Sequence, residues 1–156
     1  MIYILGERPG KNTDPSRPLY PHSSTGAAAR LYRLLSLTQE EYLAGTIRLN
    51  AADDFVVSTS SAGARSRVES FLHDSAAEPF IVLGKSALKA MPTKYRKMDF
   101  GEIIDNVLLL PHTSGVNRVW NDPVFSARMQ QIAREFINEQ RGSNSSCKAA
   151  CDGRAA

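Results

Sequence analysis

The sequence has little cysteine and no long apolar run. Its only two cysteines, Cys147 and Cys151, lie near the C-terminus. Because an iron–sulfur cluster needs about four cysteine ligands, they are too few to hold one, and so little cysteine is typical of a reduced compartment. No apolar stretch approaches the roughly 20 residues that a membrane-spanning helix needs, and we expect no signal peptide before the first apolar segment. We therefore expect a cytoplasmic protein without a membrane partner.

The composition that remains is that of an ordinary globular protein. Hydrophobic residues make up 42% of the 156 residues and charged residues 22%, with a net charge of +3. This mild positive charge is compatible with a phosphate-bearing partner but does not require one. We expect a monomer with one domain over residues 1–140. We expect a disordered tail over residues 141–156, which are rich in Ser, Asn and Ala and lack apolar periodicity.

Short apolar segments alternate with amphipathic helical patterns along the chain. The segments predicted as core strands are Met1–Leu5, Ile47–Asn50, Phe80–Leu83 and Val107–Leu110. Ile103–Ile104 is a candidate minor strand. Alternation of this kind is typical of a parallel sheet covered by helices on both faces. The sequence therefore predicts an α/β fold of three layers, α/β/α, with a central, mostly parallel sheet of four strands.

Polar loops follow the first and the last of these strands. The first loop, Gly6–Gly10, contains two glycines and a proline, which let backbone N–H groups approach a ligand closely. Its only carboxylate, Glu7, is either a solvated side chain or a group that positions a water molecule. The last strand ends at Pro111 and is followed by His112, which either caps the strand or donates a hydrogen bond to a ligand. Since open α/β sheets bind ligands at the carboxyl ends of their strands, we expect the two loops to face one pocket.

A nucleobase between these loops would meet side chains suited to hydrolysis of its N-glycosidic bond. Glu7 would hold the attacking water, and His112 would stabilise the negative charge on the departing base. Asn50, at a strand end, is either a turn residue or a reader of the amide-like edge of a pyrimidine. Tyr20, in the proline-rich segment Lys11–Ser24, either packs on the fold or stacks on the base.

These segments resemble the motifs of the uracil-DNA glycosylase superfamily. GERPG (Gly6–Gly10) resembles the GExPG motif of its iron–sulfur branch, and LPHTSGVNR (Leu110–Arg118) resembles the NPSGLxR motif of the mismatch-specific uracil/thymine branch, with histidine in place of asparagine. Pro18–Tyr20 is similar to the segment that carries the base-stacking aromatic residue, and Leu49-Asn50 to the strand end that recognises uracil. The chain departs from the family in lacking the cluster cysteines and in having Thr113 where the second motif usually has proline.

The resemblance implies a uracil-DNA glycosylase-like fold and a DNA glycosylase that acts on uracil, or on a related or modified pyrimidine flipped out of DNA. The resemblance implies no metal and no other cofactor. The residues expected in catalysis are Glu7 and His112; those expected to bind the base are Tyr20, Asn50 and Gly6; those expected to contact DNA are Ser114, Gly115, Val116, Asn117 and Arg118. Val116 would be an apolar wedge that fills the gap left by the flipped base.

Two other functions fit the same residues. One is a non-catalytic protein that binds DNA or a nucleotide on this fold, and the other is a nucleoside or nucleotide hydrolase. A polynucleotide partner is favoured by five basic residues, Arg65, Arg67, Lys94, Arg96 and Lys97, although such charges are often only a solvated face. A steep salt dependence of binding separates polynucleotides from mononucleotides, because only the former release many counterions.

Overall fold

The computed structural model of the protein describes residues 1–11, 13–53 and 57–151 and contains one central β-sheet. The strands are β1 (Ile2–Gly6), β2 (Thr46–Asn50), β3 (Phe80–Leu83), β4 (Ile103–Ile104) and β5 (Val107–Leu110). Their order is β2-β1-β3-β5-β4, and every neighbouring pair is parallel except β4 with β5. The predicted mostly parallel α/β sheet is confirmed. The predicted count of four strands is wrong, because β4 pairs with β5 and adds an antiparallel strand at the edge.

Five α-helices and two 3₁₀ helices are assigned within the described ranges. They are α1 (Ala27–Leu34), α2 (Gln39–Gly45), α3 (Ala62–Ser75), α4 (Lys85–Leu88) and α5 (Pro123–Cys151), with η1 (Thr93–Tyr95) and η2 (Arg118–Asn121). None of these helices has the length and apolarity to cross a membrane.

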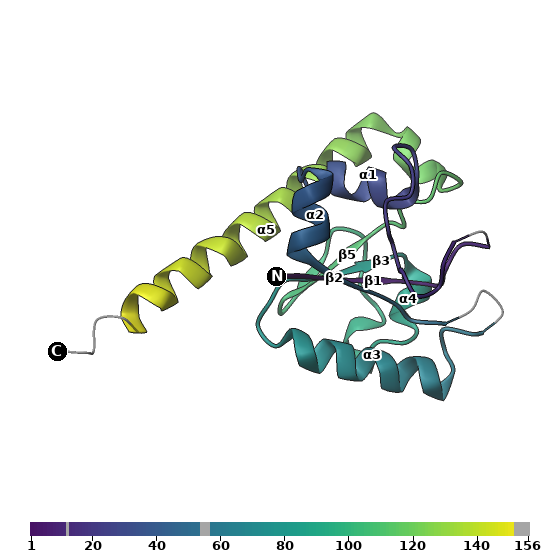
Figure 1. Cartoon of the computed structure of the whole chain (residues 1–156), viewed down its shortest axis with the longest axis horizontal. Helices are drawn as coiled ribbons and strands as arrows, with labels where there is room; N and C mark the ends of the chain where they lie inside the picture. Colours follow the sequence, from purple (N-terminus) through teal and green to yellow (C-terminus); the bar gives the residue numbers. More distant parts are fainter. Residues whose placement is uncertain (12, 54–56, 152–156) are drawn as a thin grey trace.

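The last helix, α5, extends into the tail that the sequence predicts to be disordered. The tail was expected over residues 141–156, but the backbone is helical to Cys151. No proline follows Pro123 in the sequence, so nothing forces the helix to stop earlier. Figure 1 shows the C-terminal part of α5 extending away from the sheet. Residues 152–156 of the predicted tail lie outside the described residues.

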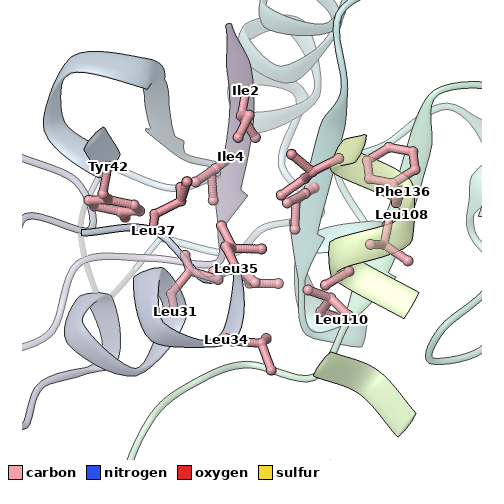
Figure 2. Packing of buried hydrophobic residues seen from close by; sticks show 14 of the residues in the cluster. Ile2, Ile4, Leu31, Leu34, Leu35, Leu37, Tyr42, Leu108, Leu110 and Phe136 are labelled. Atoms are coloured by element: carbon pink, nitrogen blue, oxygen red, sulfur yellow. The ribbon is translucent and has the colours of Figure 1, made fainter. Parts of the chain in front are cut away.

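Alternate residues of the strands face opposite sides of the sheet, and each side has its own hydrophobic cluster. Ile4, Leu108 and Leu110 belong to the cluster that includes residues of α1, α2 and α5. Their neighbours Leu5 and Leu109 belong to the cluster with α3 and α4. Figure 1 shows α1 and α2 on one side of the sheet and α3 on the other, and Figure 2 shows the first cluster from close by. Helices on both sides explain why β3 and β5 are apolar throughout.

The strand order creates a crevice at one edge of the sheet. The chain passes from β1 to β2 on one side of β1, and then to β3 on the other side. The carboxyl ends of β2, β1, β3 and β5 lie side by side, because these four strands are parallel. A reversal of strand order of this kind is where open α/β sheets bind ligands.

Candidate functional site

A cavity of about 610 Å³ opens at the carboxyl ends of the strands. This volume lies in the range of small-molecule sites. The walls come from the ends of β1, β2 and β5, from the proline-rich segment and from the N-terminus of α1. The lining residues are Glu7, Arg8, Pro9, Gly10, Thr13, Arg17, Pro18, Leu19, Tyr20, Pro21, His22, Ser23, Gly26, Ala27, Ala28, Asn50, His112, Ser114, Val116 and Asn117.

The cavity brings together most of the residues that the sequence predicts for the site. Those that line it are Glu7, Tyr20, Asn50, His112, Ser114, Val116 and Asn117. Gly6 lies beneath Asn50, where an added Cβ atom would come within 2.6 Å of the Asn50 Oδ1 atom. Gly115 and Arg118 are outside the lining; Gly115 packs against Arg30, and Arg118 is exposed at the start of η2.

Glu7 stands directly after β1 with its backbone held by the sheet. The N–H of Ala51 donates to the Gly6 carbonyl (2.9 Å) and the N–H of Ala52 donates to the Glu7 carbonyl (3.0 Å), which extends the β1–β2 pairing beyond the strands. The Glu7 side chain is 29% exposed. Its Oε1 atom accepts a hydrogen bond from Arg8 Nε (3.0 Å) and pairs with Arg8 Nη2 (2.9 Å). The result is a carboxylate at the cavity, held against a guanidinium.

His112 stands after β5 and is fixed by its own loop. The Ser114 N–H donates to His112 Nδ1 (3.0 Å), so a neutral imidazole carries its hydrogen on Nε2. Burial lowers the pKa of His112 below its ordinary value, against a smaller opposite effect of the Glu7 charge. At neutral pH the ring is therefore an uncharged N–H donor. The ring thus takes part in the structure of its own loop through Nδ1 and has a donor hydrogen on Nε2.

The carbonyl of His112 accepts two further hydrogen bonds, which hold the loop in shape. The donors are Asn117 Nδ2 (3.0 Å) and Trp120 Nε1 (2.9 Å). Asn117 Oδ1 also accepts from the Val119 N–H (3.3 Å) at the start of η2. The Asn117 amide, predicted as a DNA contact, is thus engaged within the loop and acts as a positioning residue for His112.

Two supports of His112 were missed by sequence reasoning. Gly84, after β3, has a φ of +85°, and a Cβ atom there would lie 3.3 Å from the His112 Cβ atom. A glycine is therefore needed for His112 to lie over the end of β3. Thr113 is buried and donates from Oγ1 to the Ala27 carbonyl (2.8 Å), which ties the loop to α1. The sequence shows Gly84 between a strand and a helix, which is a signal of close packing. It does not show that Thr113 pairs with Ala27, because the two residues are 86 positions apart.

Asn50 is the polar group in the cavity with the least exposed surface. It is 7% exposed, and no described residue hydrogen-bonds to its side-chain amide. Among the described side chains, no polar atom is both sealed from solvent and without a hydrogen-bond partner. The amide therefore opens on the cavity with its donor and acceptor available. A ligand in the cavity could therefore form hydrogen bonds with both the oxygen and the nitrogen of this amide.

The opposite wall is formed by the proline-rich segment, which is held by α2. Leu19 has a φ of +52°, and its carbonyl accepts a hydrogen bond from the buried Tyr42 hydroxyl (2.9 Å). The Arg17 guanidinium lies 4.5 Å from the centre of the Tyr20 ring, and the His22 ring lies 5.0 Å from it. Tyr20 therefore borders the cavity with Arg17 over one face of its ring. His22 is exposed.

The basic residues that the sequence singled out do not line this cavity. Arg67 pairs with Asp53, Lys94 pairs with Asp105, and the Nε of Arg96 donates to a backbone carbonyl. Arg65 and Arg67 belong to α3, on the side of the sheet away from α1. They therefore give no support to a polynucleotide at the cavity.

Within the described parts of the chain, no group of three or more His, Cys, Asp or Glu side chains is arranged to hold a metal ion. Comparison of the chain with protein-family models, with curated proteins and with solved structures gave no match.

Proposed function

We propose that the protein is a DNA glycosylase that hydrolyses the N-glycosidic bond of uracil or of a related pyrimidine. The observation that carries this proposal is that Glu7, Asn50 and His112, from three different strands, line one cavity. Glu7 directly follows β1, and His112 lies over the end of the neighbouring strand β3, so the carboxylate and the imidazole reach the cavity from adjacent strand ends.

The chemistry divides between the two ends of the cavity. When the bond between the base and the sugar C1′ breaks, its electron pair goes to the base and positive charge develops on the sugar. The Glu7 carboxylate orients a water molecule, balances the positive charge and accepts the proton as the water oxygen bonds to C1′. His112 donates from Nε2 to the carbonyl oxygen of the departing base and stabilises its negative charge. A neutral imidazole suits this role, because it donates without itself losing a proton.

Asn50 supplies the recognition of the base. Its amide offers one acceptor and two donor hydrogens, the complement of the N3–H and C4 carbonyl of uracil. Cytosine presents an acceptor and a donor in the opposite order. A buried amide that is set to pair with one pattern discriminates against the other, because the wrong base leaves polar groups unpaired.

The proposal includes DNA as the source of the base and a uracil-DNA glycosylase-like fold. The resemblance of Gly6–Gly10 and Leu110–Arg118 to that superfamily supports both. Val116 is 87% exposed although it is apolar, and it stands at the rim of the cavity. An exposed apolar side chain beside the cavity suits a wedge that enters the base stack when the target nucleotide flips out.

A mononucleotide hydrolase is the second candidate, favoured by a specific feature of the same cavity. Arg17 and His22 line it together with the first residues of α1. The helix begins after Gly26, which has no side chain to cap it. The Arg17 guanidinium and the His22 ring, beside backbone N–H donors, suit a phosphate monoester on the sugar.

Release of the base tests the proposal. Labelled oligonucleotides with a single uracil, opposite guanine, opposite adenine or in a single strand, are incubated with the protein and then treated with alkali. We expect strand breaks with the native chain and none with the His112→Ala variant. Deoxyuridine monophosphate is assayed beside them, and hydrolysis of it alone would favour the second candidate. DNA binding without any break would overturn the glycosylase and leave a binding protein.

A further inference from the structure

A second, smaller cavity of about 250 Å³ lies beside the His112 loop and holds unpaired positive charge. Its lining includes Arg30 and Arg33 of α1, Thr113 and Trp120 of the loop and η2, and Ser126 and Gln130 of α5. None of these residues is acidic, and α1 has no acidic residue in its sequence. The cavity is therefore a basic recess between α1 and α5, separate from the site at Glu7 and His112.

Arg30 and Arg33 present their charges on one face of the helix. Residues three apart on a helix are neighbours on its surface, and both side chains are exposed. Within the described ranges neither guanidinium forms an ion pair, and Arg33 instead lies 5.7 Å from the centre of the Tyr32 ring. By contrast, Arg67 and Lys94 each pair with an aspartate. Among the described residues, the charges of Arg30 and Arg33 are thus without an acidic partner on the α1 side of the sheet.

The basic recess is joined to the candidate active site by the loop between them. The guanidinium of Arg30 packs on Gly115, where an added Cβ atom would lie 3.0 Å from Nη1 and 3.3 Å from Nη2. The residues on either side of Gly115, Ser114 and Val116, line the first cavity. A strand of nucleic acid that leaves the first cavity across Val116 would therefore meet Arg30 next.

We propose that Arg30 and Arg33 bind phosphates of the DNA backbone beyond the flipped nucleotide, which makes the substrate a polynucleotide. The inference rests on the proposed function of the first cavity. Guanidinium groups bind phosphate oxygens through paired N–H donors. Ser126 and Gln130 add neutral donors of the kind that contact DNA backbones. A mononucleotide in the first cavity has no phosphate that extends past Gly115.

The salt dependence of DNA binding tests this inference. Binding of a fluorescent duplex with a single uracil is measured by anisotropy over a series of salt concentrations. Because each phosphate contact contributes about 0.9 to the slope of log K against log salt, we expect the Arg30→Ala/Arg33→Ala variant to lose about 1.8 from that slope. The matched control is Arg65→Ala, which removes an exposed charge from α3 on the other side of the sheet, and its slope should equal that of the native chain.

Further measurements separate this inference from the proposed function. An Arg30→Lys/Arg33→Lys variant keeps the charges and should keep the slope, which excludes misfolding as the cause of a loss. An unchanged slope in the alanine variant, or no DNA binding by the native chain, overturns the inference. The expected slopes without base release would overturn the glycosylase but retain the DNA site. Base release with an unchanged slope would retain the glycosylase and reject the DNA site.

Discussion

The main cavity has two walls that are built in different ways. On one wall, Gly6 and Asn50 are the last residues of the parallel strands β1 and β2, opposite each other in the register, and Glu7 follows β1. On the other wall, Leu19 and its neighbours form an irregular segment, which a long-range hydrogen bond from Tyr42 ties to α2. The strand wall holds the groups proposed for the reaction, and the segment wall closes the space around them. Under the proposed function, the reaction and the recognition of the base depend on the strand wall, and access of the substrate to the cavity depends on the segment wall.

The largest effect on the strand wall is expected from the Gly6→Ala substitution. The new Cβ atom would lie 2.6 Å from Asn50 Oδ1 and must displace the amide. Since a misplacement of about 1 Å can reduce the rate about 100-fold, we expect a loss of at least that size in base release. Gly63→Ala in α3, where an added Cβ meets nothing within 4 Å, is the control and should leave the rate unchanged. Equal rates of base release in the two variants would show that the position of the Asn50 amide does not matter for the reaction.

A smaller effect is expected from Asn50→Leu, which keeps the shape of the side chain but removes the amide. Loss of paired hydrogen bonds to the base should lower base release about 10- to 100-fold, the equivalent of about 1–3 kcal/mol. Stability to urea should stay within about 1 kcal/mol of the native chain, because no described residue pairs with this amide. A large fall in stability with normal activity would show that Asn50 is a structural turn residue.

The burial of His112 predicts how the free energy of unfolding depends on pH. Burial depresses the pKa of His112 in the folded state, so below about pH 6.5 the unfolded chain binds the proton more readily. The free energy of unfolding should therefore decrease as the pH falls from about 6.5 through the folded pKa. The His112→Gln variant should lack this decrease, as urea titrations at several pH values would reveal. If the free energy of unfolding had the same pH dependence in the native chain and the variant, the imidazole would not be held in its neutral form.

The smallest effect is expected at the segment wall. Tyr42→Phe removes the hydroxyl that donates to the Leu19 carbonyl, which should lower stability by about 1 kcal/mol. A loosened segment should raise KM several-fold and leave kcat nearly unchanged. Tyr32→Phe is the matched control, since in the described residues the Tyr32 hydroxyl has no hydrogen-bond partner. A fall in kcat in the Tyr42→Phe variant would mean that the segment wall contributes to the chemical step and not only to substrate access.

The same contrast explains what could be predicted from the sequence. The bounds of β3 and β5 match their apolar runs, and the positions of Glu7, Asn50 and His112 follow from where such runs end. Parallel pairing then brings these residues to one edge of the sheet. Local sequence does not reveal the left-handed Leu19 or its bond to Tyr42, because that contact spans 23 residues.

Long-range packing also determines which basic residues have an acidic partner, and the local sequence does not reveal this. The sequence pointed to basic residues such as Arg67 and Lys94, which the fold pairs with aspartates. It passed over Arg30, whose place beside Gly115 depends on how α1 docks on the loop through Thr113. Charge in a sequence thus marks a binding surface only when the fold leaves that charge unpaired.

The most direct test of the account is the single-turnover rate of base release by Glu7→Gln, measured beside its DNA affinity. Glutamine keeps the shape of the side chain but has no carboxylate to accept a proton or to balance positive charge. If Glu7 activates the water, the rate should fall about 10²- to 10⁴-fold on a uracil-containing oligonucleotide, with little change in Kd. An unchanged rate would contradict the account, because the carboxylate at the end of β1 would then have no part in the reaction.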